Sequence, residues 1–263
     1  MSEPAGTTTI NLSDIADRYL DVYQRLFDIV GFIIMSNRKI TEEDYDQFRD
    51  QFPIMPKTEA RKSFEETKEL SQNWVARNIL SEALSTIVPL LEDSRTVLAL
   101  CDYKAANKPN EAAVKKITGA DRSEFMAMEI PAKLEHLKSK YEIDSELTEH
   151  VLTLITLTKA MVMRDGILTK DEAPDGTLNL KIRSITLTQA PVAPPEGGQP
   201  ILGLTRQMSD NEREIKVGDK IVLTKAETVG SLITVAGFLA TLLQGVQQYA
   251  KKVGAADDST ATK

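Results

Sequence analysis

Two histidines, His136 and His150, are among the few residues of this sequence that could carry acid-base chemistry near neutral pH. His136 lies in a lysine-rich amphipathic segment, which is typical of a solvated helix face. His150 follows Glu146 by four residues, a spacing that predicts an ordinary surface pair on a helix. Neither histidine has a neighbour that would make it a general base, and a metal site would need a third ligand that the sequence does not reveal.

One cysteine, Cys101, completes this small set of reactive side chains. A single cysteine excludes an intramolecular disulfide and any metal site built from several cysteines, and it fits a reducing compartment. We therefore expect a cytoplasmic protein. Because Cys101 stands near the end of an apolar helical pattern, we interpret it as a small core residue.

Three further patterns resemble known sites without completing them. The segment 171–176 begins like a calcium loop, but Ala173 at its third position and Ile182 at its twelfth supply no side-chain oxygen. The glycine pair at 197–198 lies in a proline-rich stretch without the lysine and hydroxyl of a phosphate loop. The Arg-Asn pair at 77–78 is not followed by a histidine within reach. We expect no catalytic residue, no metal and no cofactor.

The charge balance also limits the partners. The 263 residues carry 32 basic and 39 acidic side chains, for a net charge of −7. The whole molecule therefore lacks the positive field that attracts nucleic acid, and no DNA partner is expected. A protein or RNA partner stays open.

The elements that must position these residues are mostly helices. Apolar residues recur at three- and four-residue spacing over 11–36, 41–52, 58–106, 125–141 and 144–163. Ser13 and Asp144 are the expected N-caps of the first and last of these segments, and Thr41 with Asp44 forms the pattern of a capping box. Pro89 interrupts the longest segment and predicts a kink or two helices.

The pattern changes after Gly166, the expected left-handed end of the fifth helix. The residues that follow predict one or two strands at 178–187, a loop at 191–200, a further strand at 214–224 and a final helix at 227–253. The predicted fold class is therefore mainly α, a multi-helix bundle with a small β-hairpin or strand insertion at about 177–224 before the C-terminal helix. We expect one domain over 11–253, with disordered ends at 1–10 and 254–263.

Two helices are unusually apolar. The segment 147–163 is apolar on more than one face, which predicts a place in the middle of the bundle. The segment 228–250 contains no charged residue and nearly has the length of a membrane span, so a tail anchor is one hypothesis. Its glycines and its three glutamines favour a buried helix instead, in which small residues let another helix approach closely.

The order of these elements resembles bacterial helical proteins related to the HEPN superfamily. The resemblance lies in the segments 131–143, 159–168 and 216–223 and in the helices between and after them. It is best over about 125–250 and extends to 11–107 by helix pattern alone. It implies an α-helical bundle with long antiparallel helices, often assembled as a homodimer.

In active members of that superfamily, an arginine and a histidine four to six residues further along one helix meet across the dimer and cleave RNA. The helix is followed by a turn at Arg164, Asp165 and Gly166. Placing Gly166 and Ile167 on the family's Gly-Ile turn puts Thr158 at the arginine position, Lys159 at the asparagine position and Met163 at the histidine position. Threonine carries no charge and methionine takes no proton, so these degenerate positions are expected to serve packing alone.

The leading hypothesis is thus a non-catalytic HEPN-like interaction or structural module that forms a homodimer. One alternative is a ribonuclease with an unconventional site. A second alternative is a protein anchored in a membrane through the helix 228–250.

Overall fold

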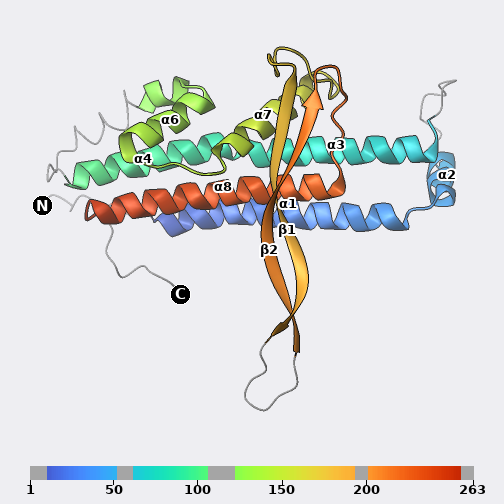
Figure 1. The fold of residues 1–263 in the computed structure, drawn as a ribbon, viewed down its shortest axis with the longest axis horizontal. Helices are drawn as coiled ribbons and strands as arrows, with labels where there is room; N and C mark the ends of the chain where they lie inside the picture. The colour runs from blue at the N-terminus through green and yellow to red at the C-terminus, as the bar shows by residue number, and fades with distance from the viewer. Residues whose placement is uncertain (1–10, 52–61, 106–121, 193–200, 256–263) are drawn as a thin grey trace, which may run out of the picture. The chain divides into compact units, whose positions relative to one another are not determined.

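The computed structural model describes residues 11–51, 62–105, 122–192 and 201–255. Within them the chain is mainly helical, and a two-stranded antiparallel sheet precedes the last helix (Figure 1). The predicted fold class is confirmed. The expectations for 1–10, for 193–200 and for 256–263 lie outside the described residues.

Helix α1 (Leu12–Lys39) buries one stripe of its surface, at Ile15, Tyr19, Tyr23, Leu26 and Val30. The expected cap at Ser13 is wrong, because the side-chain oxygen of Asn11 accepts the Ser13 N–H at 3.0 Å and so caps the helix two residues earlier.

Helix α2 (Glu42–Gln51) begins with the predicted capping box. The Thr41 N–H donates to Asp44 Oδ2 at 2.8 Å, and the Asp44 N–H donates to Thr41 Oγ1 at 3.2 Å. None of its residues is buried, so α2 lies at the surface.

The predicted interruption at Pro89 separates α3 (Phe64–Ser85) from α4 (Ile87–Ala105) at Thr86. Because proline has no N–H, it offers no helical hydrogen bond to the carbonyl four residues earlier. Of the two predicted outcomes, a kink or two separate helices, the structure confirms two separate helices.

Helix α6 (Ile130–Tyr141) carries Pro131 in its first turn, as expected, and α7 (Thr148–Met163) follows after a short connection. The expected cap of α7 at Asp144 is wrong, because the helix begins four residues later. The Asp144 carboxylate instead accepts the Ser145 N–H at 2.8 Å and pairs with Lys138 Nζ at 2.7 Å.

The expected central position of α7 is also wrong. Its buried residues form a single stripe, namely His150, Val151, Leu154, Leu157, Thr158, Ala160 and Met161. The opposite face is partly exposed, and its last two residues, Val162 and Met163, are exposed although they are apolar. The helix therefore packs against the protein through one face, and its C-terminal end exposes apolar side chains to solvent.

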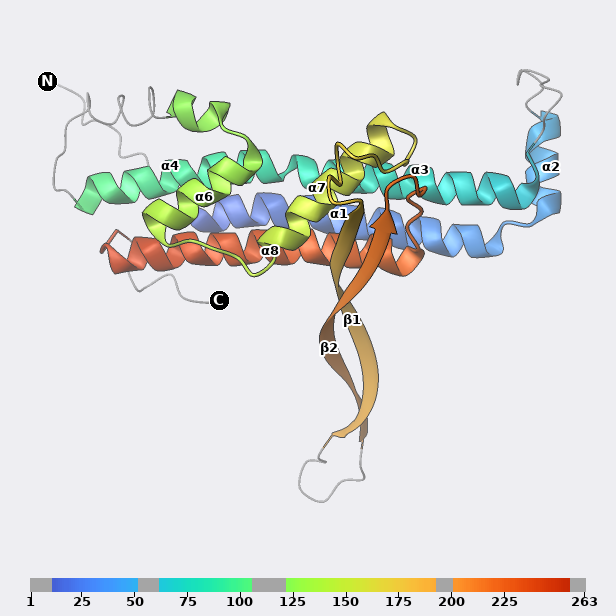
Figure 2. The same cartoon turned by 45° about the horizontal axis from the view of Figure 1, so that its top comes forward.

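Strands β1 (Thr177–Val192) and β2 (Ile201–Lys216) form an antiparallel hairpin in which Arg183 pairs with Asp210. Figures 1 and 2 show the two strands winding about each other, as paired strands do. The second strand was expected at 214–224, which is wrong beyond Lys216. Asp219 Oδ2 accepts the Lys216 N–H at 3.0 Å and turns the chain there, and Ile221 then lies against Gly166.

Helix α8 (Lys225–Lys252) contains three glycines at which atoms of neighbouring segments come close to the helix. A Cβ atom on Gly230, Gly237 or Gly245 would lie 3.0 Å from Arg183 O, 3.0 Å from Leu147 Cδ1 and 2.9 Å from Ile143 Cγ2, respectively. The small residues admit close neighbours, as predicted. These neighbours are a strand and the connection before α7, whereas the sequence predicted another helix.

The chain divides into two compact units. Unit 1 comprises 1–23, 84–149 and 235–263, and unit 2 comprises 24–83 and 150–234. Unit 2 therefore contains the C-terminal part of α1, all of α2, most of α3 and α7, the whole hairpin and the first residues of α8. The expectation of one domain over 11–253 stays a prediction.

Candidate functional site

Thr158 and Met163, which the resemblance aligned with a catalytic pair, differ sharply in exposure. Thr158 is buried and its hydroxyl has no hydrogen-bond partner among the described residues, whereas Met163 is 74% exposed. Lys159 between them is exposed. The expectation that this stretch serves packing alone stays a prediction: burial of Thr158 agrees with it, whereas α7 ends at Met163 and no described element covers that side chain.

The turn after Met163 is held by main-chain hydrogen bonds. Asp165 and Gly166 both have a positive φ, 50° and 82°, and the Gly166 N–H donates to Ala160 O at 3.1 Å. The Ile221 N–H donates to Gly166 O at 2.7 Å, and a Cβ on Gly166 would lie 3.2 Å from Ile221 O. The predicted left-handed glycine is confirmed, and it fixes the end of α7 against the segment that leads into α8.

The remaining residue of this turn, Arg164, anchors the following loop. Its guanidinium pairs with Asp171 at 2.8 Å and with Glu172 at 3.2 Å. The Glu172 side chain is only 3% exposed and accepts the Thr169 N–H and hydroxyl. The Thr169 hydroxyl and N–H, together with the Arg164 charge, lower the pKa of Glu172 despite its burial.

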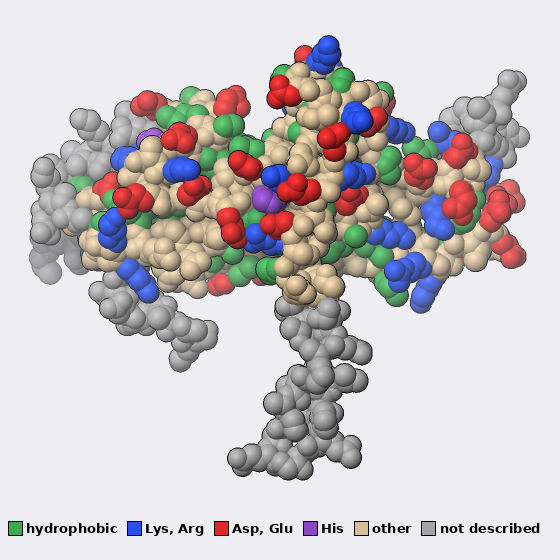
Figure 3. All heavy atoms as spheres, viewed as in Figure 1, with side chains coloured by type: hydrophobic (Ala, Val, Ile, Leu, Met, Phe, Trp, Pro, Cys, Tyr) green, Lys and Arg blue, Asp and Glu red, His purple; other side chains and the backbone are tan. Residues whose placement is uncertain are grey.

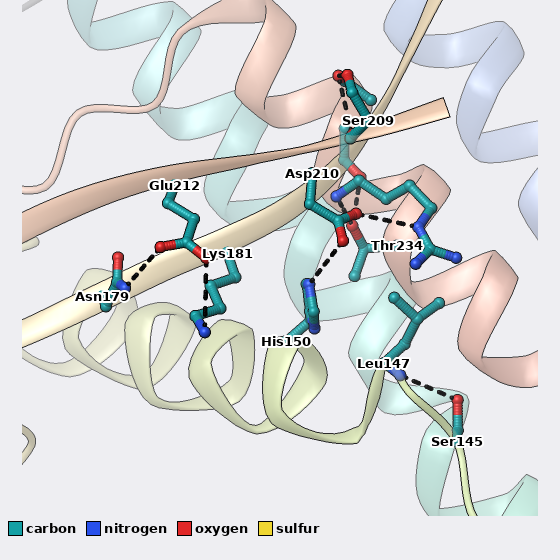
Figure 4. A network of polar contacts seen from close by, with 12 residues as sticks. Ser145, Leu147, His150, Asn179, Lys181, Ser209, Asp210, Glu212 and Thr234 are labelled. Atoms are coloured by element: carbon teal, nitrogen blue, oxygen red, sulfur yellow. Dashed lines mark hydrogen bonds and ion pairs between the residues drawn. The ribbon is translucent and has the colours of Figure 1, made fainter. Parts of the chain in front are cut away.

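His150 is buried, at 9% exposure, so the expected surface pair with Glu146 is wrong. Its Nε2 lies 3.9 Å from Asp210 Oδ2 on β2, which is an ion-pair distance but too long for a hydrogen bond, and neither ring nitrogen has a hydrogen-bond partner in the described structure. Figure 4 shows the imidazole pointing from α7 toward this carboxylate. Asp210 also pairs with Arg183 at 3.2 Å.

The same side of the hairpin carries a cross-strand polar group. Asn179 and Lys181 on β1 both point at Glu212 on β2 (Figure 4), with a hydrogen bond of 3.1 Å and an ion pair of 3.5 Å. These two contacts hold the pKa of Glu212 below its ordinary value, with the Asn179 hydrogen bond the larger cause. The group fixes strand register and resembles no catalytic arrangement.

His136 is half-buried and was expected on a solvated face. Its ring lies between those of Phe125 and Tyr141, at centroid distances of 5.4 and 6.2 Å. Cys101 is buried as predicted, and burial raises the pKa of its thiol. Among the described residues no three His, Cys, Asp or Glu side chains lie close enough together to hold a metal ion.

A hollow of unit 2, named here the α1–α3 groove, has a volume of about 850 Å³. Its lining comes from α1, α3, the end of α7 and the segment before α8, as follows: Ile33, Asn37, Thr67, Leu70, Ser71, Asn73, Trp74, Val75, Arg77, Met161, Asp165, Gly166, Lys220 and Ile221. The α3 residues recur at the three- and four-residue spacing of one helix face. The turn at Gly166 therefore forms part of the groove wall.

The groove combines apolar walls with few charges. Trp74 is the single tryptophan of the chain and is 59% exposed there. Arg77 and Lys220 supply two positive charges against one negative charge from Asp165. The Oδ1 atom of Asn73 is buried without a hydrogen-bond donor in the described structure. Such a lining is suited to binding and lacks a nucleophile with an adjacent base.

Exposed apolar side chains are unevenly distributed between the units. Of the large apolar residues exposed in the described structure, all but Leu20 and Met126 belong to unit 2. They include the end of α7 and the edge of the α1–α3 groove. Acidic and basic side chains are interspersed over the face in view in Figure 3, without a continuous basic surface. These features favour binding to an apolar partner over binding to a nucleic-acid backbone.

Helix α8 is long and apolar enough to cross a membrane by length and composition, and half of its most apolar window is buried within the protein. Four of its apolar side chains, Leu232, Val235, Phe238 and Val246, are fully buried. Length and composition alone are weak evidence, since the core helix of a soluble protein satisfies the same criteria. Membrane anchoring stays an untested alternative.

Comparisons with family models, with curated proteins and with solved structures find no match to this chain. Similarity to known proteins therefore supplies neither a family nor a function. The candidate sites depend on their own geometry.

The sequence predicted that Thr158, Lys159 and Met163 lie on one helix, which the structure confirms, but it gave no indication of the α1–α3 groove. In the sequence, Trp74 is one of the apolar residues of the helical pattern over 58–106. The only local signal was the recurrence of Leu70, Trp74 and Arg77 on one face of α3, where a cation follows two large apolar residues.

Proposed function

We propose that the protein is a non-catalytic, HEPN-like interaction module that self-associates through the exposed apolar end of α7. The observation that carries the proposal is the 74% exposure of Met163 at the position where the superfamily's histidine would stand. Val162 and Ile167 are each 47% exposed within the same short stretch of chain. We name these three residues the α7 apolar cluster.

Self-association is favoured because the α7 apolar cluster is present on every copy. In a twofold-symmetric dimer the same patch on both copies forms the contact, so a single exposed cluster suffices to form an interface. Burying such side chains removes apolar surface from water, which stabilises association. Met163 of the two copies would then meet near the symmetry axis.

Light scattering of the full-length protein at micromolar concentration tests this proposal. The wild type is expected at twice 29.1 kDa, and Met163→Glu is expected near 29.1 kDa because it places a charge in the apolar contact. Met208→Glu is the matched control, since Met208 is 62% exposed on β2, outside the cluster, and should leave the dimer intact. A wild type that remains at 29.1 kDa would rule out self-association.

The ribonuclease alternative is tested by incubating the purified protein with RNA. We expect no cleavage, because Thr158 is buried and uncharged and Met163 takes no proton. Of the two histidines, His150 is buried and the His136 ring packs against Phe125. Cleavage that is abolished by His150→Ala or by His136→Ala would contradict the proposal and restore an enzymatic role.

A further inference from the structure

We propose that the α1–α3 groove binds a small amphipathic carboxylate, with the anionic head at Arg77 and Lys220 and the apolar body against Trp74, Leu70 and Ile33. This site goes beyond self-association at the α7 apolar cluster and does not depend on it.

The charges of the groove indicate an anion. Neither Arg77 nor Lys220 forms a side-chain ion pair or hydrogen bond in the described structure, although the chain as a whole has a net charge of −7. Most of the other arginines in the described structure form ion pairs with carboxylates, as Arg164 and Arg213 do. A guanidinium presents two parallel N–H donors that match the two oxygens of a carboxylate.

The main chain holds these groups in place. Lys220 pairs with Ile167 in an isolated β-bridge, and the adjacent Ile221 N–H is bonded to Gly166 O at 2.7 Å. Arg77 lies in the middle of α3, one turn after Trp74 and Asn73. Both cations are therefore carried by ordered segments that line the same hollow, so a bound anion would need little reordering of the backbone.

The walls indicate the rest of the ligand. Trp74 and Leu70 remain exposed to solvent at the groove, and a ligand with an apolar chain or ring would cover them. The buried Asn73 Oδ1 can accept a hydrogen bond from a water beside the head group, although not from the ionised carboxylate itself. The volume of about 850 Å³ lies in the range typical of small-molecule sites.

The same features argue against other ligand classes. A polyphosphate or an RNA strand would need a larger excess of positive charge than two cations beside Asp165 supply. A cationic ligand would meet Arg77 and Lys220 directly. A wholly apolar ligand would leave both cations without a partner, so it is expected to bind more weakly than the carboxylate.

Fluorescence of Trp74, the only tryptophan, gives a direct readout in the full-length protein. Titration with sodium dodecanoate below its micelle concentration is expected to give a saturable shift of the emission to shorter wavelength, at one ligand per chain, because the half-exposed indole becomes covered. Isothermal titration calorimetry provides the same affinity without relying on the fluorophore. Dodecyltrimethylammonium, of equal chain length and opposite charge, should give no saturable change.

Variants distinguish a specific anion site from nonspecific binding of the apolar chain. Arg77→Gln and Lys220→Gln should each weaken dodecanoate binding by about tenfold, the usual effect of removing a charged hydrogen-bond partner. Lys170→Gln, at an exposed lysine outside the groove lining, should leave it unchanged. The inference is overturned if dodecanoate gives no saturable signal, or if 1-dodecanol binds as tightly and Arg77→Gln has no effect. Light scattering of the same samples tests self-association separately, so either proposal can fail alone.

Discussion

Single residues at the end of α7 determine what this part of the protein can do. Thr158 and Met163 lie five positions apart on one helix, yet the first is buried and the second is among the most exposed apolar residues described. An arginine at Thr158 would bury a charge without a partner, which costs several kcal/mol, so a ribonuclease pair could not simply be introduced here by substitution. The exposed Met163 is apolar and takes no proton, which is why we propose it as a contact residue.

Gly166 is the residue on which the turn after α7 depends. Gly166→Ala is expected to lower the free energy of unfolding by about 2 kcal/mol. The positive φ is strained for alanine, and the added Cβ would lie only 3.2 Å from Ile221 O. Gly176→Ala is the matched control, since Gly176 has a similar φ of 88° but open space around it, and should cost about 1 kcal/mol. Urea denaturation measures both values. Equal losses would show that the contact with Ile221 is unimportant.

Glu172 makes stability depend on pH. Its folded pKa lies below the unfolded value, so its contribution is present above the ordinary glutamate pKa and is lost as the pH falls through the lowered folded value. Glu172→Gln should therefore have a lower melting temperature than the wild type at pH 7, and the difference should shrink below about pH 4.3.

The control for this measurement is Asp171→Asn, which removes the more exposed carboxylate paired with Arg164. It should change stability by less than about 0.5 kcal/mol at pH 7. A melting-temperature difference for Glu172→Gln that stays constant from neutral to acidic pH would contradict the role assigned to its carboxylate.

At the scale of elements, local chemistry predicted the helices well and the second strand poorly. Thr41 with Asp44 and Pro89 act through neighbours within a turn of the chain, so their patterns can be recognised in sequence. The middle of β2 is instead a run of polar residues at 209–214, without the alternation that identifies a strand. Its structure comes from main-chain pairing with β1, which no local pattern in β2 specifies.

The hairpin is tied to α8 by the ion pair of Arg213 with Glu227 and by a hydrogen bond to Thr234. Thr234 Oγ1 accepts the Arg183 N–H at 2.7 Å, and it donates to Gly230 O within its own helix. Thr234→Val should lower the free energy of unfolding by about 2 kcal/mol, because the valine removes the hydroxyl that accepts the Arg183 N–H. Thr228→Val is the matched control, since Thr228 bonds only the carbonyl of Thr224 and should lose about 0.5 kcal/mol or less.

Chemical denaturation of the two variants provides the comparison, and amide hydrogen exchange at Arg183 reports the contact itself. Exchange should accelerate in Thr234→Val and stay slow in Thr228→Val. If both variants lose the same stability, the hairpin is not anchored through this hydroxyl.

At the scale of the whole molecule, the binding features gather in unit 2. The α1–α3 groove and the α7 apolar cluster both belong to it, and so do nearly all the exposed apolar side chains described. The sequence indicated the absence of catalytic and metal-binding patterns, because those depend on residue types and short spacings. It could not indicate the groove, because Ile33, Trp74 and Lys220 become neighbours only after segments far apart in the chain have packed.

Cysteine cross-linking at Met163 tests the central claim most directly. In a Cys101→Ala background, Met163→Cys is expected to form an intermolecular disulfide on mild oxidation and to run at twice 29.1 kDa on a non-reducing gel, because in the proposed dimer this residue of the two copies would meet near the symmetry axis. Met208→Cys in the same background should remain near 29.1 kDa. If Met163→Cys cross-links no more than Met208→Cys does, the exposed end of α7 is not the self-association surface.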